Sequence, residues 1–190
     1  MTLLIDGGAN EGQYASRVRK SGYSGSILSI EPYSVAFYIL KSLSQHDDKH
    51  KVLNCALGSS KREQKLHLSS NSGMSSSLHL PMKHLEFFPT VKFEGDEIVN
   101  VVTLDELVEG QNEKIFLKLD VQGSELEILE SVTTCLPMIV AMEIEITLQP
   151  MYEGESTIGK ILTQIESWVS MYSVSTSLQK IKMDKLLILI

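Results

Sequence analysis

Apolar residues along this chain fall into two alternating patterns. Short apolar runs of strand length occur at residues 3–5, 26–30 and 115–119, and an acidic residue follows each of them. Continuous apolar runs of this length are typical of strands buried on both faces of a parallel sheet. Apolar residues at helical spacing follow the first two runs, at residues 14–22 and 34–43. This alternation predicts an α/β domain built from strand–helix units.

The remaining segments continue this pattern to the end of the chain. Further strands are expected at residues 51–55, 64–68 and 99–102, in a run that ends at Glu143, and as a closing pair at residues 174–177 and 186–190. Helices are expected after Thr103 and Ser124, each of which has a glutamate three residues on as in a capping box, and at residues 157–168. We expect one domain over residues 1–190, which is long enough for a sizeable core.

The turn after the first strand carries the strongest functional signal. It reads Asp6-Gly7-Gly8-Ala9-Asn10-Glu11-Gly12 and leads into a helix. Glycines permit positive φ and let a ligand lie against the backbone, and the free N–H groups of a new helix can face that ligand. We therefore predict a nucleoside-cofactor site that includes Asp6, Gly7, Asn10 and Gly12. A turn whose glycines serve only tight packing is the alternative.

The charge of Asp6 bears on which cofactor binds. A dinucleotide would place its pyrophosphate on this turn, where a carboxylate would repel it, and the glycine spacing departs from the dinucleotide pattern G-x-G-x-x-G. S-adenosylmethionine carries a sulfonium and an ammonium, so the acidic residue favours it instead.

A second carboxylate follows the second strand, in the pair Glu31-Pro32. The carboxyl ends of adjacent parallel strands lie side by side, and Glu31 comes about 20 residues after the glycine turn, where an acidic residue can bind ribose hydroxyls. We therefore predict that Glu31 and Pro32 belong to the cofactor site. A surface glutamate that closes a strand is the alternative.

Four motifs in this order resemble an FkbM-type methyltransferase. They are the glycine turn, Glu31-Pro32, residues 54–58 (Asn-Cys-Ala-Leu-Gly) and residues 117–125 (Leu-Lys-Leu-Asp-Val-Gln-Gly-Ser-Glu). Met142-Glu143 and residues 148–154 also fall where members of that family carry similar segments. Two features depart from the family: Gln122 stands where members usually have glutamate, and the chain begins almost on its first strand.

The resemblance implies a class I S-adenosylmethionine-dependent methyltransferase. It implies a Rossmann-like three-layer α/β/α sandwich, in which a mostly parallel seven-stranded sheet has an antiparallel last strand. In this architecture ligands bind outside the carboxyl ends of the strands, and the loops there can close over them. The Ser-, Asn- and Gly-rich segment at residues 69–77 is such a loop, and Ser76, or Ser75, could donate to the cofactor or the substrate. A plain connector is the alternative for this loop.

Three residues are candidates for the chemistry of methyl transfer. Asp120 ends the predicted central strand beside the glycine turn, so it is the best candidate for a base that takes a proton from the acceptor. Glu143, which we expect to end the fifth strand, is the second candidate. Lys118 could orient a substrate carboxylate or polarise a hydroxyl. Alternatively, Lys118 and Asp120 share a face of the strand and form a structural pair.

Composition narrows the range of partners. A formal net charge of −7 argues against nucleic acid, which binds to basic surfaces. No apolar run approaches 18 residues, so we expect no membrane insertion and a cytoplasmic protein. The two cysteines, Cys55 and Cys135, are expected to be buried free thiols, and the five histidines show no ligand spacing, so no metal site is predicted.

We therefore expect a methyltransferase that acts on a hydroxyl of a small molecule or glycan, with S-adenosylmethionine as its cofactor; a homo-oligomer is left open. Two alternatives remain. One is a nicotinamide- or flavin-linked oxidoreductase on a related fold, against which Asp6 counts. The other is a cofactor-binding domain that has lost catalysis.

Overall fold

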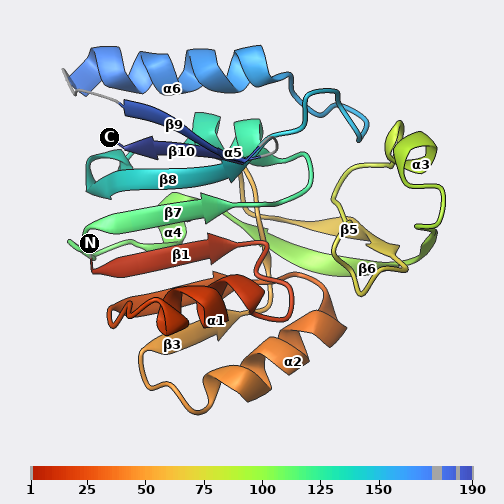
Figure 1. The fold of residues 1–190 in the computed structure, drawn as a ribbon, viewed down its shortest axis with the longest axis horizontal. Coiled ribbons are helices and arrows are strands. Elements are labelled where there is room, and N and C mark those ends of the chain that lie inside the picture. The colour runs from red at the N-terminus through yellow and green to blue at the C-terminus, as the bar shows by residue number, and fades with distance from the viewer. Residues whose placement is uncertain (1, 173–176, 183–184, 190) are drawn as a thin grey trace.

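The computed structural model describes residues 2–172, 177–182 and 185–189, which form two sheets with flanking helices (Figure 1). The main sheet has the strand order β3-β2-β1-β7-β8-β10-β9 among these residues. Its strands are β1 (Leu3–Gly7), β2 (Ser26–Ile30), β3 (His50–Leu53), β7 (Ile115–Leu119), β8 (Ile139–Glu145), β9 (Ser177–Lys182) and β10 (Lys185–Leu189). The first five are parallel to their neighbours in that group, whereas β10 runs antiparallel to both β8 and β9. The predicted Rossmann-like sandwich with an antiparallel last strand is confirmed.

The strands of the main sheet bury side chains on both faces, because successive side chains point to opposite sides. On one face, Leu3 and Ile5 of β1 share a core with α4 (Leu104–Leu107), α5 (Glu125–Ser131) and α6 (Ile158–Tyr172). On the other face, Leu4 packs with Ala15 of α1 (Gln13–Lys20). Helices thus cover both faces of the sheet, which is why the strands read as continuous apolar runs.

The second helix buries a different face from the one its apolar spacing indicates. In α2 (Ser34–Ser44), Ala36 and Leu40 are buried, whereas Val35, Ile39 and Leu43 are exposed. The helix lies beside the edge strand β3. It therefore covers only the rim of the sheet, and part of its apolar surface faces solvent.

A smaller sheet with the order β4-β6-β5 forms an arm beside the main sheet, on the right of Figure 1. Its strands are β4 (Ala56–Leu57), β5 (Arg62–Ser69) and β6 (Phe93–Val102), and α3 (His84–Phe87) lies in the connection between β5 and β6. Leu66, Leu78 and Val101 belong to its small core. The sequence indicated only short strands at residues 64–68 and 99–102. Their pairing into a long antiparallel ladder depends on residues more than thirty positions apart, such as Gln64 and Val99.

Several expected boundaries were wrong. The strand expected at residues 51–55 is β3, which ends at Leu53. Of the closing strand expected at residues 174–177, Ser177 belongs to β9, whereas residues 174–176 lie outside the described part of the chain, as does Ile190 of the last strand. The capping box at Thr103 and Glu106 is confirmed. The one expected at Ser124 is absent, because the Ser124 hydroxyl lies 3.1 Å from Nε2 of His79 instead. No helix among the described residues is long and apolar enough to cross a membrane.

Candidate active site

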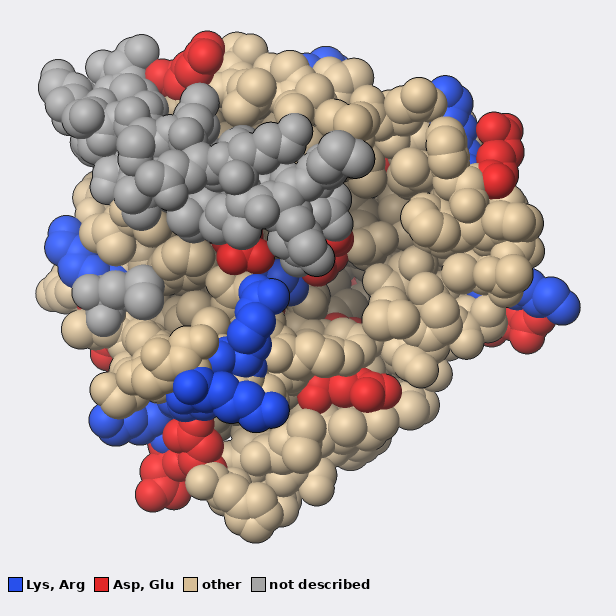
Figure 2. All heavy atoms as spheres, in the orientation of Figure 1, with Lys and Arg blue, Asp and Glu red and all other residues tan. Residues whose placement is uncertain are grey.

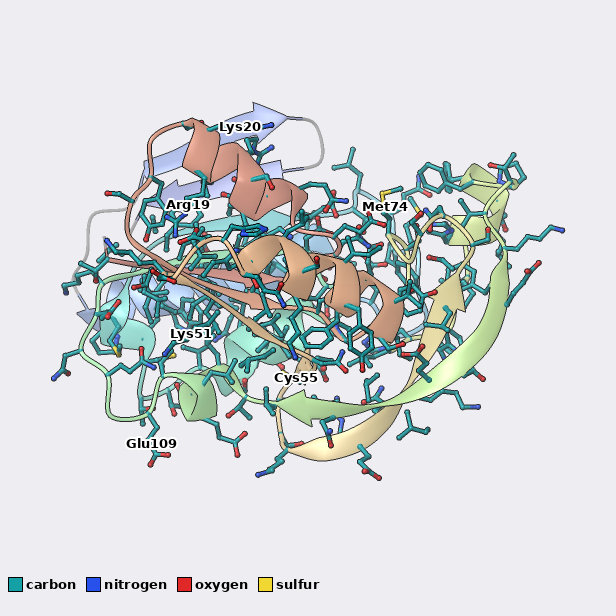
Figure 3. The ribbon with its side chains drawn as sticks, turned by 90° about the horizontal axis from the view of Figure 1, so that it is seen from below. Arg19, Lys20, Lys51, Cys55, Met74 and Glu109 are labelled. Atoms are coloured by element: carbon teal, nitrogen blue, oxygen red, sulfur yellow. The ribbon has the colours of Figure 1, made fainter. Side chains whose placement is uncertain are left out.

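A cavity of about 530 Å³ lies where the carboxyl ends of the central strands meet the arm. Figure 2 shows the surface hollowed at this place, beside the arm. The side chains that line it come from the turn after β1, the end of β2, the segment around β4, the loop at residues 69–77, the turn after β7 and the end of β8. Met74 and Cys55, labelled in Figure 3, line it from the loop and from the segment before β4. Its volume suits a small-molecule or cofactor site.

The glycine turn brings the ends of β1 and β7 into backbone contact. Gly8 has a φ of 70°, and a Cβ there would lie 1.8 Å from the carbonyl oxygen of Asp120. Only glycine fits this position. The N–H groups of Gly8 and Ala9 both donate to the carbonyl oxygen of Ile30 at 3.0 Å. These two N–H groups, which precede the helix, therefore fasten the turn to the end of β2.

Asp6 lies under the turn and outside the cavity lining. It is fully buried, and its Oδ1 lies 3.0 Å from Nζ of Lys118. That ammonium also donates to the carbonyl oxygens of Gly7 at 3.2 Å and Gly8 at 2.9 Å. Burial opposes the charged form of Lys118, but the carboxylates of Asp6 and Asp120 outweigh it and raise the lysine pKa. Lys118 is therefore a cation that holds the turn together.

This pairing corrects the charge argument drawn from the sequence. Lys118 balances the charge of the Asp6 carboxylate, because the two residues lie in register on the neighbouring strands β7 and β1. Asp6 therefore does not by itself repel a pyrophosphate at the turn. Gly7 and Gly12 also lie outside the lining, whereas Asn10 is part of it.

Glu31 and Pro32, which we expect in the cofactor site, both line the cavity. The two carboxylate oxygens of Glu31 accept N–H bonds from Asn10 at 2.7 Å and Tyr33 at 2.8 Å. Burial raises the pKa of Glu31 to about 7, although these two hydrogen bonds oppose the rise. An ionised carboxylate has about four acceptor positions, so those that remain can take hydroxyl donors from a ligand.

Asp120 lies in the cavity wall, and Gln122 and Glu145 lie beside it. The backbone N–H of Asp120 donates to the carbonyl oxygen of Gly7 at 3.1 Å, which fixes the end of β7 against the glycine turn. The side chain of Asp120 accepts a hydrogen bond from Nε2 of Gln122 at 2.9 Å and lies 3.6 Å from Nζ of Lys118. Gln122 also donates to Glu145 at 3.2 Å. The side-chain amide of Gln122 therefore lies between the carboxylates of Asp120 and Glu145.

Glu143 lies within β8 instead of ending it, so its predicted place at the strand end was wrong. It is buried outside the cavity lining, where it accepts a hydrogen bond from the Tyr14 hydroxyl at 3.0 Å and lies 3.8 Å from Arg17. Burial and the nearby Glu143 raise the pKa of Tyr14. The residue that ends β8 and lines the cavity is Glu145. Sequence reasoning missed it because the strand continues two residues further, although Glu143 and Glu145 share a strand face.

The loop at residues 69–77 contacts both sides of the cavity. Asn10 donates through Nδ2 to the carbonyl oxygen of Ser72 at 3.0 Å, and Ser77 donates through Oγ to that of Gln122 at 2.6 Å. Ser76 lines the cavity, and its hydroxyl accepts the N–H of Ser69 at 3.0 Å. Ser75 is buried. Of the two serines considered from the sequence, Ser76 is therefore the one in the lining.

The cavity lining includes one thiol, that of Cys55. Cys55 and Cys135 are buried free thiols, and burial raises the pKa of Cys55 to about 11, so it is protonated at neutral pH. Within the described residues, no group of three or more histidine, cysteine, aspartate or glutamate side chains is arranged to hold a metal ion.

Comparisons with known proteins agree with this architecture. A family model described as "Methyltransferase FkbM domain" matches residues 6–170. The chain is similar to a solved structure of methyltransferase FkbM from Methylobacillus flagellatus KT, with a TM-score of 0.61 and 15% identity. That match covers 100% of this chain and 43% of the other, so this chain spans less than half the length of that protein.

Two further solved structures are similar at lower identity. A putative caffeoyl-CoA O-methyltransferase from Staphylococcus aureus gives a TM-score of 0.51 at 10% identity, covering 99% of this chain and 75% of the other. The METTL16 methyltransferase domain gives 0.51 at 10% identity, covering 99% and 59%. At such identities these likenesses establish the fold alone. The comparison with curated proteins found no match.

Proposed function

We propose, because the chain belongs to the FkbM methyltransferase family, that it transfers a methyl group from S-adenosylmethionine to a hydroxyl of a small molecule or glycan. The observation that carries the proposal is the charge of the cavity wall. Three carboxylates line it, from Glu31, Asp120 and Glu145. Two cations line it as well, Lys118 and Arg17, but each lies close to a carboxylate outside the lining, at 3.0 Å from Asp6 and 3.8 Å from Glu143 respectively. An acidic cavity suits a cationic ligand better than a pyrophosphate. This argument replaces the one that rested on Asp6.

Glu31 would hold the ribose of the cofactor in this proposal. Its carboxylate accepts two backbone N–H groups and faces the cavity, so ribose hydroxyls can complete its hydrogen bonds. Pro32, Ala56 and Leu57 give the same end of the cavity an apolar wall, against which an adenine ring can pack. Asn10, in the turn, and Ser76, in the loop, also line the cavity and could contact the rest of the cofactor.

Asp120, in the turn after β7, would act on the methyl group and the acceptor. When bound, the cofactor supplies a methyl group on a positively charged sulfur. The Asp120 carboxylate can stabilise that charge, and it can accept the proton that leaves the acceptor hydroxyl as the new C–O bond forms. Asp120 is held between Lys118 and Gln122, so its position is defined before any ligand binds. Lys118, which is buried and paired, would position the turn and not the substrate.

Calorimetric titration with S-adenosylmethionine and with NAD tests the cofactor. Binding of the first alone supports the proposal, and binding of NAD alone would favour the oxidoreductase alternative. Release of S-adenosylhomocysteine with a panel of hydroxylated acceptors then separates an enzyme from a domain that only binds cofactor.

Asp120→Asn tests the role of the carboxylate, with Asp48→Asn, at an exposed position, as the matched control. Loss of a base should lower turnover about 10²–10⁴-fold while cofactor binding is kept. Loss of an electrostatic partner should instead weaken S-adenosylmethionine more than neutral S-adenosylhomocysteine. Normal turnover together with a normal ratio of the two affinities would remove Asp120 from the mechanism.

A further inference from the structure

The side chain of Gln122 contacts three polar side chains at the cavity wall. Its backbone has a φ of 56°, a left-handed conformation that is uncommon for a residue other than glycine. Its Nε2 donates to Asp120 at 2.9 Å and to Glu145 at 3.2 Å. Both N–H groups of one amide are therefore used on two carboxylates, one from the end of β7 and one from the end of β8.

Tyr152 fixes the orientation of that amide. The tyrosine is almost fully buried, and its hydroxyl lies 2.8 Å from Oε1 of Gln122 and 2.9 Å from the carbonyl oxygen of Ser75. Burial raises the phenol pKa, so the hydroxyl stays a donor. The single phenol proton is shared between these two oxygens. The carboxylates of Asp120 and Glu145 are acceptors, so the amide nitrogen faces them and Oε1 faces the tyrosine hydroxyl. The carbonyl oxygen of Gln122 in turn accepts from Ser77, which ties the same residue to the loop.

The charges around Asp120 and Glu145 explain what the side-chain amide of Gln122 contributes. Asp120 is close to the ammonium of Lys118, behind which lies Asp6. Further carboxylates lie nearby: Glu145 from β8, Glu125 from α5 and Glu155 from the loop that carries Tyr152. Like charges this close raise each other's pKa. Two amide N–H donors stabilise the ionised form of both acceptors.

We propose that Gln122 is a positioning residue, held by Tyr152, whose amide keeps the carboxylates of Asp120 and Glu145 ionised and fixed in the cavity wall. A role for this arrangement in methyl transfer rests on the proposed function, but the arrangement itself can be measured without any ligand. The test is a pH titration of the protein labelled with ¹³C at aspartate and glutamate carboxyl groups, followed by NMR. The Asp120 and Glu145 signals are assigned from Asp120→Asn and Glu145→Gln.

Gln122→Glu replaces the bridging amide with a third carboxylate. It should raise the titration midpoint of Asp120 or Glu145 by about one pH unit or more. Gln111→Glu is the matched control, because it adds the same charge at an exposed position outside the cavity and should leave both midpoints unchanged. Gln122→Met removes the two donors without adding charge, so it should raise the midpoints by less. Tyr152→Phe should act in the same direction, because the amide loses its orientation.

If Gln122→Glu does not fold, Gln122→Met and Tyr152→Phe decide the question. Midpoints that match those of the unaltered protein in every folded variant would overturn the inference, whether or not S-adenosylmethionine binds. Conversely, shifted midpoints in a protein that binds no S-adenosylmethionine would uphold the positioning role and reject the proposed function. The two ideas can therefore fail separately.

Discussion

The pH dependence of ligand binding at Glu31 offers the sharpest test of the site. Burial raises the pKa of Glu31 to about 7, from an ordinary value of 4.5. The folded protein therefore holds this proton more tightly than the unfolded chain does. The stability that results is fully present below about pH 4.5, falls as the pH rises, and is lost above about pH 7, where the difference amounts to about 3 kcal/mol.

A ligand that donates ribose hydroxyls to this carboxylate binds its ionised form. If only that form binds, the affinity should be about tenfold weaker at pH 6 than at pH 8 and should level off above pH 7. Global stability cannot isolate this effect, because burial also raises the pKa of Glu125 to about 7. Glu125 lies outside the cavity lining, so binding reports on Glu31 more directly.

The assay is calorimetric titration with 5′-methylthioadenosine, which keeps the adenine and ribose but has no amino acid group that titrates. Titrations between pH 6 and 8, in buffers of different ionisation enthalpy, give both the affinity and the number of protons released. Glu31→Gln is the matched variant: it should bind more weakly at pH 8, by about 1.5–3 kcal/mol for each lost charged hydrogen bond, and should show no pH dependence. Its fold is checked by circular dichroism, because one amide hydrogen would face a backbone N–H.

A constant affinity of the unaltered protein between pH 6 and 8 would refute the argument. So would a slope that persists in Glu31→Gln, because another group would then be responsible for it.

Three further predictions follow from the contacts around the turn. Lys118→Met leaves the buried Asp6 without its partner and should lower the free energy of unfolding, measured in urea, by about 3–5 kcal/mol. Lys51→Met, at an exposed position, should lower it little. Recovery of stability when Asp6→Asn is added to Lys118→Met would identify the charge as the cause. Gly8→Ala should cost at least about 2 kcal/mol, against about 1 kcal/mol for Gly110→Ala, which has nearly the same φ but open space around it; equal costs would show that contact with Asp120 is unimportant. In hydrogen exchange, residues 69–77 should gain protection when S-adenosylhomocysteine binds, while residues 45–49 should not; equal protection with and without ligand would make the first segment a plain connector.

Residues close together in the sequence were sufficient to predict the strands and the turn that frame the cavity. Two strands and the turn between the first strand and its helix were recognisable from local patterns. Buried parallel strands leave continuous apolar runs in the sequence, and glycine or acidic residues follow these runs at the carboxyl ends of the strands. The capping box at Thr103 is equally local, since its two hydrogen bonds join residues three apart. Glu31, at the end of the second of these strands, lies in the cavity lining.

The tertiary structure decided which of these charged residues face the cavity. Asp6 and Lys118 were both singled out from the sequence, yet only adjacent strands in register make them a buried pair. Glu145 replaces Glu143 in the lining because β8 extends two residues further than expected.

The bridge at Gln122 could not be predicted from the sequence either, because it joins residues from four separate segments. Its partners are Ser77 of the loop, Asp120 after β7, Glu145 of β8 and Tyr152. Apolar periodicity determines which segments form strands and helices, because burial acts on each segment through its own pattern. Partners for polar side chains depend on distances between segments, which are defined only when the chain has folded. The sequence by itself therefore determined the elements and the edge of the sheet where the cavity lies, and the tertiary structure determined which carboxylates meet there.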